Sequence, residues 1–359
     1  MQVAIIGLPL SGKTTIFEAL TQNDAHAGGH SAGRYRISTA IVDVPDPRVD
    51  ALSALFRPRK TTYARIQFND ISGIGGDVGE SKGLDAQLLT AIAPCDALLQ
   101  VVRGFDNPTV PHPAGDIEPR RDLAALRFEL LISDLAVVER RIERIEAGLK
   151  KSRADAGLTK ELALMRRFKE ALENETPLVN VEMDEEEAFM VRGFQFLTLK
   201  PAMVLLNLND DDDADVDLAW ANHHRRTSAV ALKGVLEKEI ARLPEEDRAL
   251  FLEDYGIAAP GLEVMVRQCY DLLGLMSFFT VGEDEVRAWT VRRGATAVEA
   301  AGAIHSDLAR GFIRAEVISY DEMIDCGTLA EARKRGKLRL EGKDYVVQDG
   351  DILSIRFNV

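Results

Sequence analysis

The most informative stretch of the chain lies near its N-terminus and reads Gly7-Leu8-Pro9-Leu10-Ser11-Gly12-Lys13-Thr14-Thr15. The apolar run at residues 2–6 comes directly before it and predicts a buried parallel strand. Residues 16–20 come directly after it and have the pattern of an amphipathic helix. A GxxxxGK(S/T) pattern between a strand and a helix is typical of a loop that holds phosphate groups with its backbone N–H groups. We therefore expect an α/β P-loop nucleotide-binding domain with a mostly parallel sheet and helices on both faces.

The residues of this loop have separate expected roles. The Lys13 ammonium is expected to reach the β- and γ-phosphates of a nucleotide, and the Thr14 hydroxyl is expected to bind Mg²⁺, the expected cofactor. The other nucleotide contacts predicted here are Gly7, Leu10, Ser11, Gly12 and Thr15.

A second motif follows about fifty residues later, a spacing typical of P-loop switch proteins. Asp70-Ile71-Ser72-Gly73 fits a DxxG pattern, in which Asp70 acts through Mg²⁺ and Gly73 offers its backbone N–H to the γ-phosphate. Ras-like enzymes place a water-orienting Gln at the next position, but this chain has Ile74 there. Hydrolysis is therefore expected to be slow or to use another group.

A third motif is expected to contact the base. Asn207-Leu208-Asn209-Asp210 follows a buried apolar run, where GTPases carry NKxD; Leu208 takes the place of the Lys that covers guanine. Ser228 and Ala229 fit the loop that touches the edge of the base. An ordinary turn at a strand end is the alternative for residues 207–210, but the order of the three motifs along the chain favours base recognition.

Residues 135–198 are expected to form an inserted antiparallel helical hairpin. Apolar residues recur at steps of three and four from Leu131 to Leu149 and again from Leu158 to Leu172, with charged residues between them. The two interpretations, a solvated hairpin and an arm that docks a large partner, are equally supported. The nucleotide-binding domain is then expected at residues 1–134 and 199–275.

Residues 276–359 are expected to form a C-terminal ubiquitin-like β-grasp domain. Strands are predicted at 286–291, 313–319, 337–340, 345–347 and 352–357, with a helix at 297–308. Its clustered basic residues permit an RNA contact, and a solvated charged turn is the alternative. These residues are Arg333, Lys334, Arg335, Lys337 and Arg339.

Composition limits the class of protein. The 359 residues carry 44 Lys and Arg against 58 Asp and Glu, for a net charge of −14, which argues against a general polyanion coat and sequence-specific DNA binding. No apolar run reaches the roughly 18 residues of a membrane span, and the N-terminus lacks the pattern of a signal peptide. The three cysteines form no CxxC pair. A cytoplasmic protein without a membrane partner is expected.

Along its whole length the chain resembles the YchF-type ATPases of the Obg-related group of P-loop proteins, as a divergent member. The resemblance rests first on residues 7–15, 44–48, 70–73 and 100–103. It is closest near the C-terminus, where several runs look like the TGS domain of that family: residues 278–280, 285–290, 300–302, 311–317 and 345–351.

The resemblance implies a preference for ATP over GTP, which the family owes to an NxxE motif in place of NKxD. Asn207 and Leu208 match that motif, and Asp210 stands where Glu is usual. It also implies that His112, after the strand ending Val101-Val102-Arg103, is in the place of a mobile catalytic histidine; an exposed loop histidine without a role is the alternative. Leu10 replaces an Asn with which relatives hold potassium, which argues against potassium stimulation.

The first switch loop also departs from the family pattern. The family carries a Thr for Mg²⁺ there, whereas residues 34–37 lack one, and Thr39 is a weak substitute. Whether this loop still binds Mg²⁺ is left open by the sequence.

Together these observations predict a slow, Mg²⁺-dependent nucleoside triphosphate hydrolase of the YchF type. ATP is expected to be preferred over GTP, and the ribosome, its RNA or translation factors are the expected partners. One alternative is a GTPase of the Obg type, because Asp210 retains the carboxylate that guanine needs. The other is a nucleotide-gated ribosome- or RNA-binding adaptor whose hydrolysis is incidental.

Overall fold

The computed structural model describes the chain apart from residues 22–27, 33–34, 74–85, 152–154, 255–258 and 359. The chain divides into two compact units. The larger unit comprises Met1–Ile41 and Gln67–Leu262, and the smaller unit comprises Val42–Ile66 and Glu263–Val359. No helix in the described ranges combines the length and the apolar character that a membrane crossing requires.

A seven-stranded sheet lies at the centre of the larger unit, in the order β2-β3-β5-β1-β6-β7-β8. The pairs β1–β5, β1–β6, β6–β7 and β7–β8 are parallel, and β2 pairs antiparallel with β3. The expected α/β class with a mostly parallel sheet is therefore confirmed. The strands are β1 (Gln2–Ile6), β2 (Gly28–Ala32), β3 (Tyr35–Asp43), β5 (Arg65–Gly73), β6 (Ala97–Arg103), β7 (Ala202–Asn207) and β8 (Thr227–Leu232).

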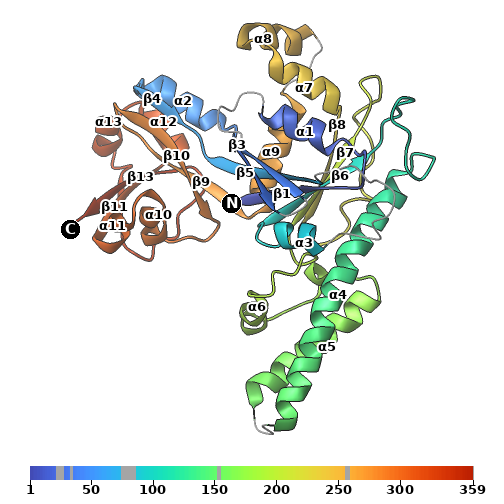
Figure 1. The fold of residues 1–359 in the computed structure, drawn as a ribbon. Coiled ribbons are helices and arrows are strands. Elements are labelled where there is room, and N and C mark those ends of the chain that lie inside the picture. Colours follow the sequence, from blue (N-terminus) through green and yellow to red (C-terminus); the bar gives the residue numbers. More distant parts are fainter. Residues whose placement is uncertain (22–27, 33–34, 74–85, 152–154, 255–258, 359) are drawn as a thin grey trace. The chain divides into compact units, whose positions relative to one another are not determined.

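Helices cover both faces of this sheet (Figure 1). On one face α1 (Lys13–Thr21) packs beside α7 (Gly234–Arg242), which leads to α8 (Glu245–Asp254). On the other face, α3 (Ala86–Ile92) and the first turns of α4 (Pro119–Lys151) pack on alternate residues of the strands. Side chains of this second layer include Ile6, Leu98, Ile92, Leu126 and Leu130.

The helix α4 is 33 residues long, and its side chains pack in two separate hydrophobic cores. Leu126 and Leu130 pack on the sheet, whereas Val138 and Ile145 pack against α5 (Ala156–Glu173) in a separate apolar cluster. The expected domain boundary at residue 135 thus falls within a continuous helix, because no glycine or proline interrupts it there.

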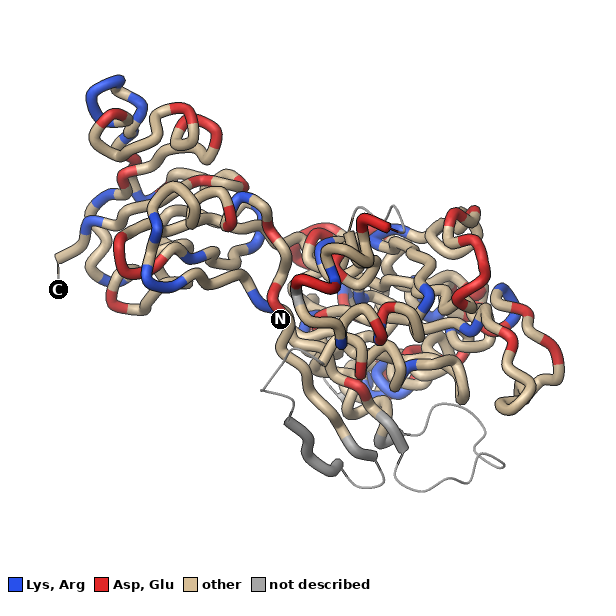
Figure 2. Tube along the Cα trace, turned by 90° about the horizontal axis from the view of Figure 1, so that it is seen from above, with Lys and Arg blue, Asp and Glu red and all other residues tan. Residues whose placement is uncertain are grey.

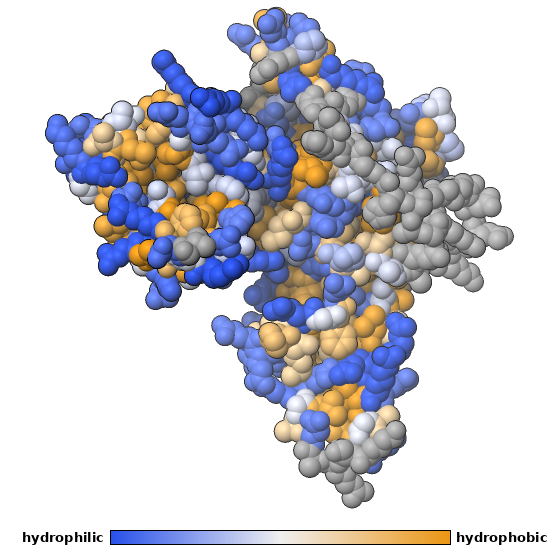
Figure 3. All heavy atoms as spheres, turned by 60° about the vertical axis from the view of Figure 1, so that its left-hand side comes forward, coloured by the Kyte–Doolittle hydropathy of each residue, from blue (hydrophilic) through white to orange (hydrophobic). Residues whose placement is uncertain are grey.

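Figure 1 shows α4 and α5 running side by side away from the sheet, with α6 (Glu185–Val191) close by. The short 3₁₀ helix Leu178–Asn180 follows α5. Arg141 of α4 donates two hydrogen bonds of 2.7 Å to Glu161 of α5. Figure 3 shows hydrophobic residues between hydrophilic ones on the surface of this arm. We refer to α4 beyond Leu131 together with α5 as the arm.

The smaller unit contains a six-stranded mixed sheet in the order β12-β11-β13-β9-β10-β4. Its core is formed by α10 (Ala297–Ile304), whose Ala300 and Ala301 pack with Phe278, Phe312 and Val317. The strands are β4 (Lys60–Thr62), β9 (Leu275–Thr280), β10 (Glu285–Arg292), β11 (Phe312–Ser319), β12 (Arg339–Glu341) and β13 (Asp351–Phe357). The other helices are α2 (Pro47–Phe56), α9 (Gly261–Leu272), α11 (Ser306–Arg310), α12 (Tyr320–Cys326) and α13 (Leu329–Lys334).

Two details of this unit differ from the sequence prediction. The helix expected at 297–308 is divided at His305, whose extended backbone ends α10 and whose side chain caps α11. The strand expected at 345–347 is reduced to an isolated bridge between Thr296 and Val346.

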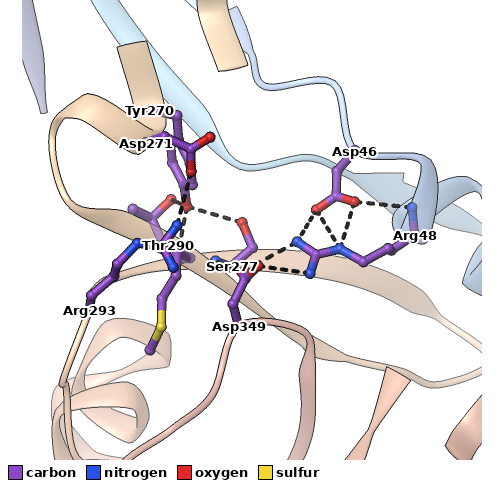
Figure 4. A network of polar contacts seen from close by, with 9 residues as sticks. Asp46, Arg48, Tyr270, Asp271, Ser277, Thr290, Arg293 and Asp349 are labelled. Atoms are coloured by element: carbon purple, nitrogen blue, oxygen red, sulfur yellow. Dashed lines mark hydrogen bonds and ion pairs between the residues drawn. The ribbon is translucent and has the colours of Figure 1, made fainter. Parts of the chain in front are cut away.

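The largest difference concerns residues 42–66, which were expected in the nucleotide-binding domain but fold with the C-terminal residues. The strand β4 pairs in parallel with β10. Asp46 caps α2 and pairs with Arg48, whose guanidinium also binds the Asp349 carboxylate at 3.0 Å (Figure 4). The Asp349 carboxylate in turn accepts the backbone N–H of Ser277, so residues 44–48 are joined to the C-terminal sheet.

Candidate functional site

The predicted phosphate loop connects β1 to α1 at the carboxyl end of β1, and its two glycines are required by close packing. A Cβ on Gly7 would lie 2.3 Å from the carbonyl oxygen of Val101. Gly12 has φ +90°, and a Cβ there would lie 2.1 Å from the side chain of Asn207. Leu10 also has positive φ, at 62°, and its side chain is 43% exposed. Leu10 can therefore contribute only its backbone N–H and carbonyl groups to the loop. Its apolar side chain has no oxygen that could bind a cation.

Asn207 joins the phosphate loop to the loops that follow two other strands. Its Nδ2 donates to the carbonyl oxygen of Ser11 at 3.2 Å, and its Oδ1 accepts the N–H of Gly234 at 3.0 Å. The side chain is 4% exposed. The three segments meet at the carboxyl edge of the parallel sheet, which is where open α/β sheets bind ligands.

Lys13 lies at the start of α1 with its ammonium folded onto the loop. It donates to the carbonyl oxygens of Gly7 and Leu8 at 3.0 and 2.8 Å. Burial lowers the pKa of Lys13 to about 8, and the negative charge of Asp70 opposes that shift. Because backbone carbonyls are its partners here, the ammonium can exchange them for phosphate oxygens without breaking an ion pair.

Two buried oxygen atoms beside this loop lack partners among the described residues: Asp70 Oδ1 and Ser11 Oγ. Asp70 is 2% exposed, and burial raises the pKa of its carboxyl group against the opposing charge of Lys13. A buried carboxylate oxygen without a donor is costly. Such an atom is expected where a cation or an ordered water completes the site.

The donor set fits Mg²⁺ held together with a nucleotide. Thr14 is exposed at the start of α1, and Asp70 lies nearby on β5 opposite Ile5. In the part of the chain that the structure describes, no group of three or more His, Cys, Asp and Glu side chains could hold a metal alone. Mg²⁺ commonly takes one or two protein oxygens and completes its octahedron with phosphates and water.

The second motif is only partly described. Gly73 is the last residue of β5, and Ile74, which takes the place of the usual Gln, lies outside the described residues. In the first switch region, Thr39 donates its hydroxyl hydrogen to Asn69 Oδ1 at 3.1 Å. Thr39 is therefore already engaged within the sheet.

The side chain of Leu208 points into the core. It is 8% exposed and packs in an apolar cluster with Val102 and Leu206. Asp210 lies in the loop after β7, where its Oδ1 accepts the N–H of Leu236 at 3.2 Å. One oxygen of the Asp210 carboxylate is thus engaged by the first turn of α7.

The structure does not bring Ser228 and Ala229 to this edge. Both lie inside β8, opposite Met203 and Val204, because the strand continues to Leu232. The residues that do reach the edge follow it: Lys233 Nζ donates to the carbonyl oxygen of Asp210 at 2.8 Å, and Gly234 contacts Asn207. The sequence signal that could have found them is the end of the apolar run at Leu232.

Arg103 holds the loop that follows β6. It is fully buried and donates to the carbonyl oxygens of Phe105 and Val110 at 3.1 and 2.6 Å. Its guanidinium lies 4.5 Å from the centre of the Phe105 ring. A Cβ on Gly12 would lie 3.5 Å from that ring, so Phe105 is beside the phosphate loop. Sequence reasoning did not select Phe105.

His112 is held within this loop by both ring nitrogens. Its Nε2 lies 2.8 Å from Asp122 Oδ2, and its Nδ1 accepts the N–H of Ala114 at 3.1 Å. This pairing places the proton on Nε2. The His112 side chain is 6% exposed, which does not match the alternative of an exposed loop histidine. Together with Leu8, Pro9 and Ser11 it lines a small hollow beside the phosphate loop.

The basic cluster of the smaller unit is offset by carboxylates. Arg333 pairs with Glu316, Arg335 with Glu331, and Lys337 with Glu322. Further pairs join Lys334 to Glu331 and Arg339 to Glu341 and Asp351. Figure 2 shows the basic segment at the upper left with acidic residues next to it. These pairs favour a solvated charged turn over an open phosphate-binding face.

Comparisons with known proteins cover the whole chain. The model of the family YchF-GTPase_C, described as "Protein of unknown function (DUF933)", matches residues 275–358. The Ribosome-binding ATPase YchF of Bacillus subtilis is 38% identical over 100% of both chains. That of Haemophilus influenzae is 40% identical over 99% of this chain and 98% of its own. The structure of the YchF GTPase of Schizosaccharomyces pombe aligns with a TM-score of 0.84 at 28% identity, covering 99% of this chain and 97% of that one.

Proposed function

This chain belongs to the YchF family, and from that premise we propose that it is a nucleoside triphosphate hydrolase that works with the ribosome in the cytoplasm. Several bacterial relatives bear the name Ribosome-binding ATPase. The observation that carries the proposal is the double hydrogen bond of Asn207, which joins the phosphate loop to the loop after β8.

The phosphate loop would hold the triphosphate through its backbone N–H groups and the first turn of α1. Lys13 would leave the carbonyl oxygens of Gly7 and Leu8 and bind the β- and γ-phosphates. Thr14 and Asp70 would hold Mg²⁺, which when bound offsets the charge that develops on the phosphates. The Gly73 N–H would hold the γ-phosphate.

Hydrolysis would be slow because no Gln follows Gly73 and because His112 is engaged. Both ring nitrogens of His112 have partners, so it must leave Asp122 and Ala114 before it can contact water or a phosphate oxygen. We assign His112 the role of positioning water or relaying a proton. Until then, the hydrogen bond to Asp122 would keep the His112 ring away from the nucleotide.

ATP would be preferred over GTP. A Lys that covers guanine is replaced by Leu208, which is turned into the core. The Asp210 carboxylate, which would accept the N1 and N2 hydrogens of guanine, already accepts the N–H of Leu236. Adenine has no N1 and N2 hydrogens to donate to Asp210, so the hydrogen bond between Asp210 and Leu236 would not weaken ATP binding. Phe105 and the backbone of residues 209–210 and 233–234 would surround the base.

An Obg-type GTPase is the second candidate, since Asp210 retains its carboxylate and the Schizosaccharomyces pombe relative is called a GTPase. We further assign residues 276–359, together with Val42–Ile66, to the TGS-type β-grasp domain, and the arm to the inserted helical domain. The arm carries apolar side chains between charged ones, and it would contact the ribosome.

Turnover and co-sedimentation with ribosomes test the proposal together. We expect slow hydrolysis by the protein alone, faster hydrolysis with ribosomes, and ribosome binding that depends on the nucleotide; Lys13→Ala should lose all three responses. Nucleotide-dependent binding without any change in turnover would identify an adaptor with incidental hydrolysis. Binding to neither nucleotide nor ribosome would remove the proposal.

A further inference from the structure

The larger unit contains a second cavity that the nucleotide site does not use. It has a volume of about 330 Å³, within the range of sites that hold small organic molecules. It lies between the first turns of α4, the strands β6 to β8 and the loop that carries Trp220. Much of its wall is apolar or aromatic, including Leu98, Leu130, Leu197, Phe128 and Trp220.

Polar hydrogen-bond donors line one part of this cavity. Gln100 is buried in the sheet, and its Oε1 lies 3.4 Å from Arg127 Nε. Arg127 Nη2 donates to the carbonyl oxygen of Ala221 at 2.6 Å. The hydrogen bonds that Arg127 and Gln100 make to described residues use Arg127 Nε and Nη2 and Gln100 Oε1, and they leave out Arg127 Nη1 and Gln100 Nε2. Two neighbouring donor groups are therefore available to a ligand.

His224 adds a third donor. Asn180 accepts the N–H of Arg225 through its Oδ1, so its Nδ2 is the atom that donates to His224 Nδ1 at 2.9 Å. The remaining proton of a neutral His224 is then on Nε2, which has no partner in the described part of the chain. Burial lowers the pKa of His224 to about 4, with further lowering by the charges of His223 and Arg127. The ring is thus neutral at pH 7 and close to Arg127.

The charge of the cavity is opposite to that of the chain. The described residues that line it include Arg120, Arg127 and Lys200 but only one carboxylate, Glu175, whereas the whole chain has a net charge of −14. The Arg120 guanidinium lies 5.6 Å from the centre of the Trp220 ring. The Lys200 ammonium donates to the carbonyl oxygens of Ala93 and Cys95. It would therefore attract an anionic ligand through its positive charge and not through a direct hydrogen bond.

We propose that this cavity is a binding site for a small aromatic carboxylate, with the carboxylate on Gln100, Arg127 and His224 and the flat ring against Trp220 and the leucines. A planar guanidinium suits a carboxylate, and the neutral donors beside it add hydrogen bonds without repulsion. The site is separate from the phosphate loop and does not depend on the assigned nucleotide function.

The test uses 2-naphthoate as the probe in ligand-observed NMR titrations on the full chain, first without and then with a saturating non-hydrolysable ATP analogue. A ligand of this size that fits its site should bind with a dissociation constant of about 1 mM or tighter. The neutral 2-naphthalenemethanol, of the same shape, should bind at least fivefold more weakly. Arg127→Met should remove most of the difference in affinity between the acid and the alcohol, while the affinity for the alcohol stays unchanged.

Two successive alanines of α4 provide a matched pair of variants. Ala124 and Ala125 are both exposed, but only Ala124 lines the cavity. Ala124→Phe should fill the cavity and weaken 2-naphthoate at least tenfold, and Ala125→Phe should leave its affinity within twofold of wild type. The proposal is overturned by equal affinity for acid and alcohol, by equal effects of the two alanine variants, by displacement of the probe by the ATP analogue, or by no saturable binding in the millimolar range.

Discussion

Asn207 at the end of β7 hydrogen-bonds to the backbone of Ser11 in the phosphate loop, with 3.2 Å between Asn207 Nδ2 and the Ser11 carbonyl oxygen. The two residues are 196 positions apart in the chain. The same side chain accepts the Gly234 N–H, so a buried amide joins the predicted phosphate loop to the start of α7. We therefore propose that Asn207, the Asn of the third motif, organises the nucleotide site by holding these two segments together.

Asn207→Ala is expected to weaken ATP binding at least tenfold and to lower the free energy of unfolding by about 1–3 kcal/mol, the usual cost of leaving a buried N–H without an acceptor. Calorimetric titration with an ATP analogue and urea denaturation measure the two effects. Asn174→Ala, which removes an exposed amide at the end of α5, is the control and should change neither. An Asn207 variant that binds ATP as wild type does would contradict this role.

Lys13→Ala is expected to abolish detectable triphosphate binding while leaving the fold intact, because the ammonium is the point charge that meets the phosphates. Circular dichroism checks the fold, and titration with an ATP analogue checks binding. Lys169→Ala, which removes the ion pair between Lys169 and Glu139 on the arm, is the control and should bind the ATP analogue as wild type does. Unchanged affinity in Lys13→Ala would remove the phosphate-loop assignment.

The affinity for ATP should fall above pH 8. In the free protein the pKa of Lys13 is about 8, and a phosphate prefers the charged ammonium. Below pH 8 the lysine is already protonated and the affinity should be constant; above it, protonation must accompany binding, so the affinity falls by up to tenfold per pH unit. Titrations with an ATP analogue from pH 7 to pH 9.5 measure this, and a flat profile would show that Lys13 stays charged.

His112→Ala should slow hydrolysis by more than about tenfold without weakening ATP binding. A tenfold loss of rate is at the low end for removing a group that relays a proton. Single-turnover measurements separate the two quantities. His305→Ala, at the cap of α11 in the smaller unit, serves as the control. A rate within twofold of wild type would show that His112 only holds its loop together with Asp122.

The features that the sequence predicted correctly are those that local pattern determines. The strand–loop–helix at residues 2–21, the strands that end at Asn207 and Gly73, and the long helical periods all depend on neighbours within a few residues. The resemblance to the YchF family, stated from short motifs, is confirmed by relatives that align over the full chain.

The features that the sequence did not predict depend on contacts between distant residues. The strand β4 pairs with β10, and Arg48 at the start of α2 contacts Asp349, which is 301 positions away. Ser228 and Ala229 match a motif but lie inside a strand whose end is set by pairing with β7. Asp122 was not selected because nothing near it in the sequence indicates that it would meet His112.

The most direct test of the nucleotide site is a competition titration of non-hydrolysable ATP and GTP analogues on the wild-type protein with Mg²⁺ present. The engaged Asp210 carboxylate and the buried Leu208 side chain lead us to expect that the ATP analogue binds more tightly, and that removing Mg²⁺ weakens it. Equal or tighter binding of the GTP analogue would assign the chain to the GTPases, and failure of both analogues to bind would contradict the nucleotide site itself.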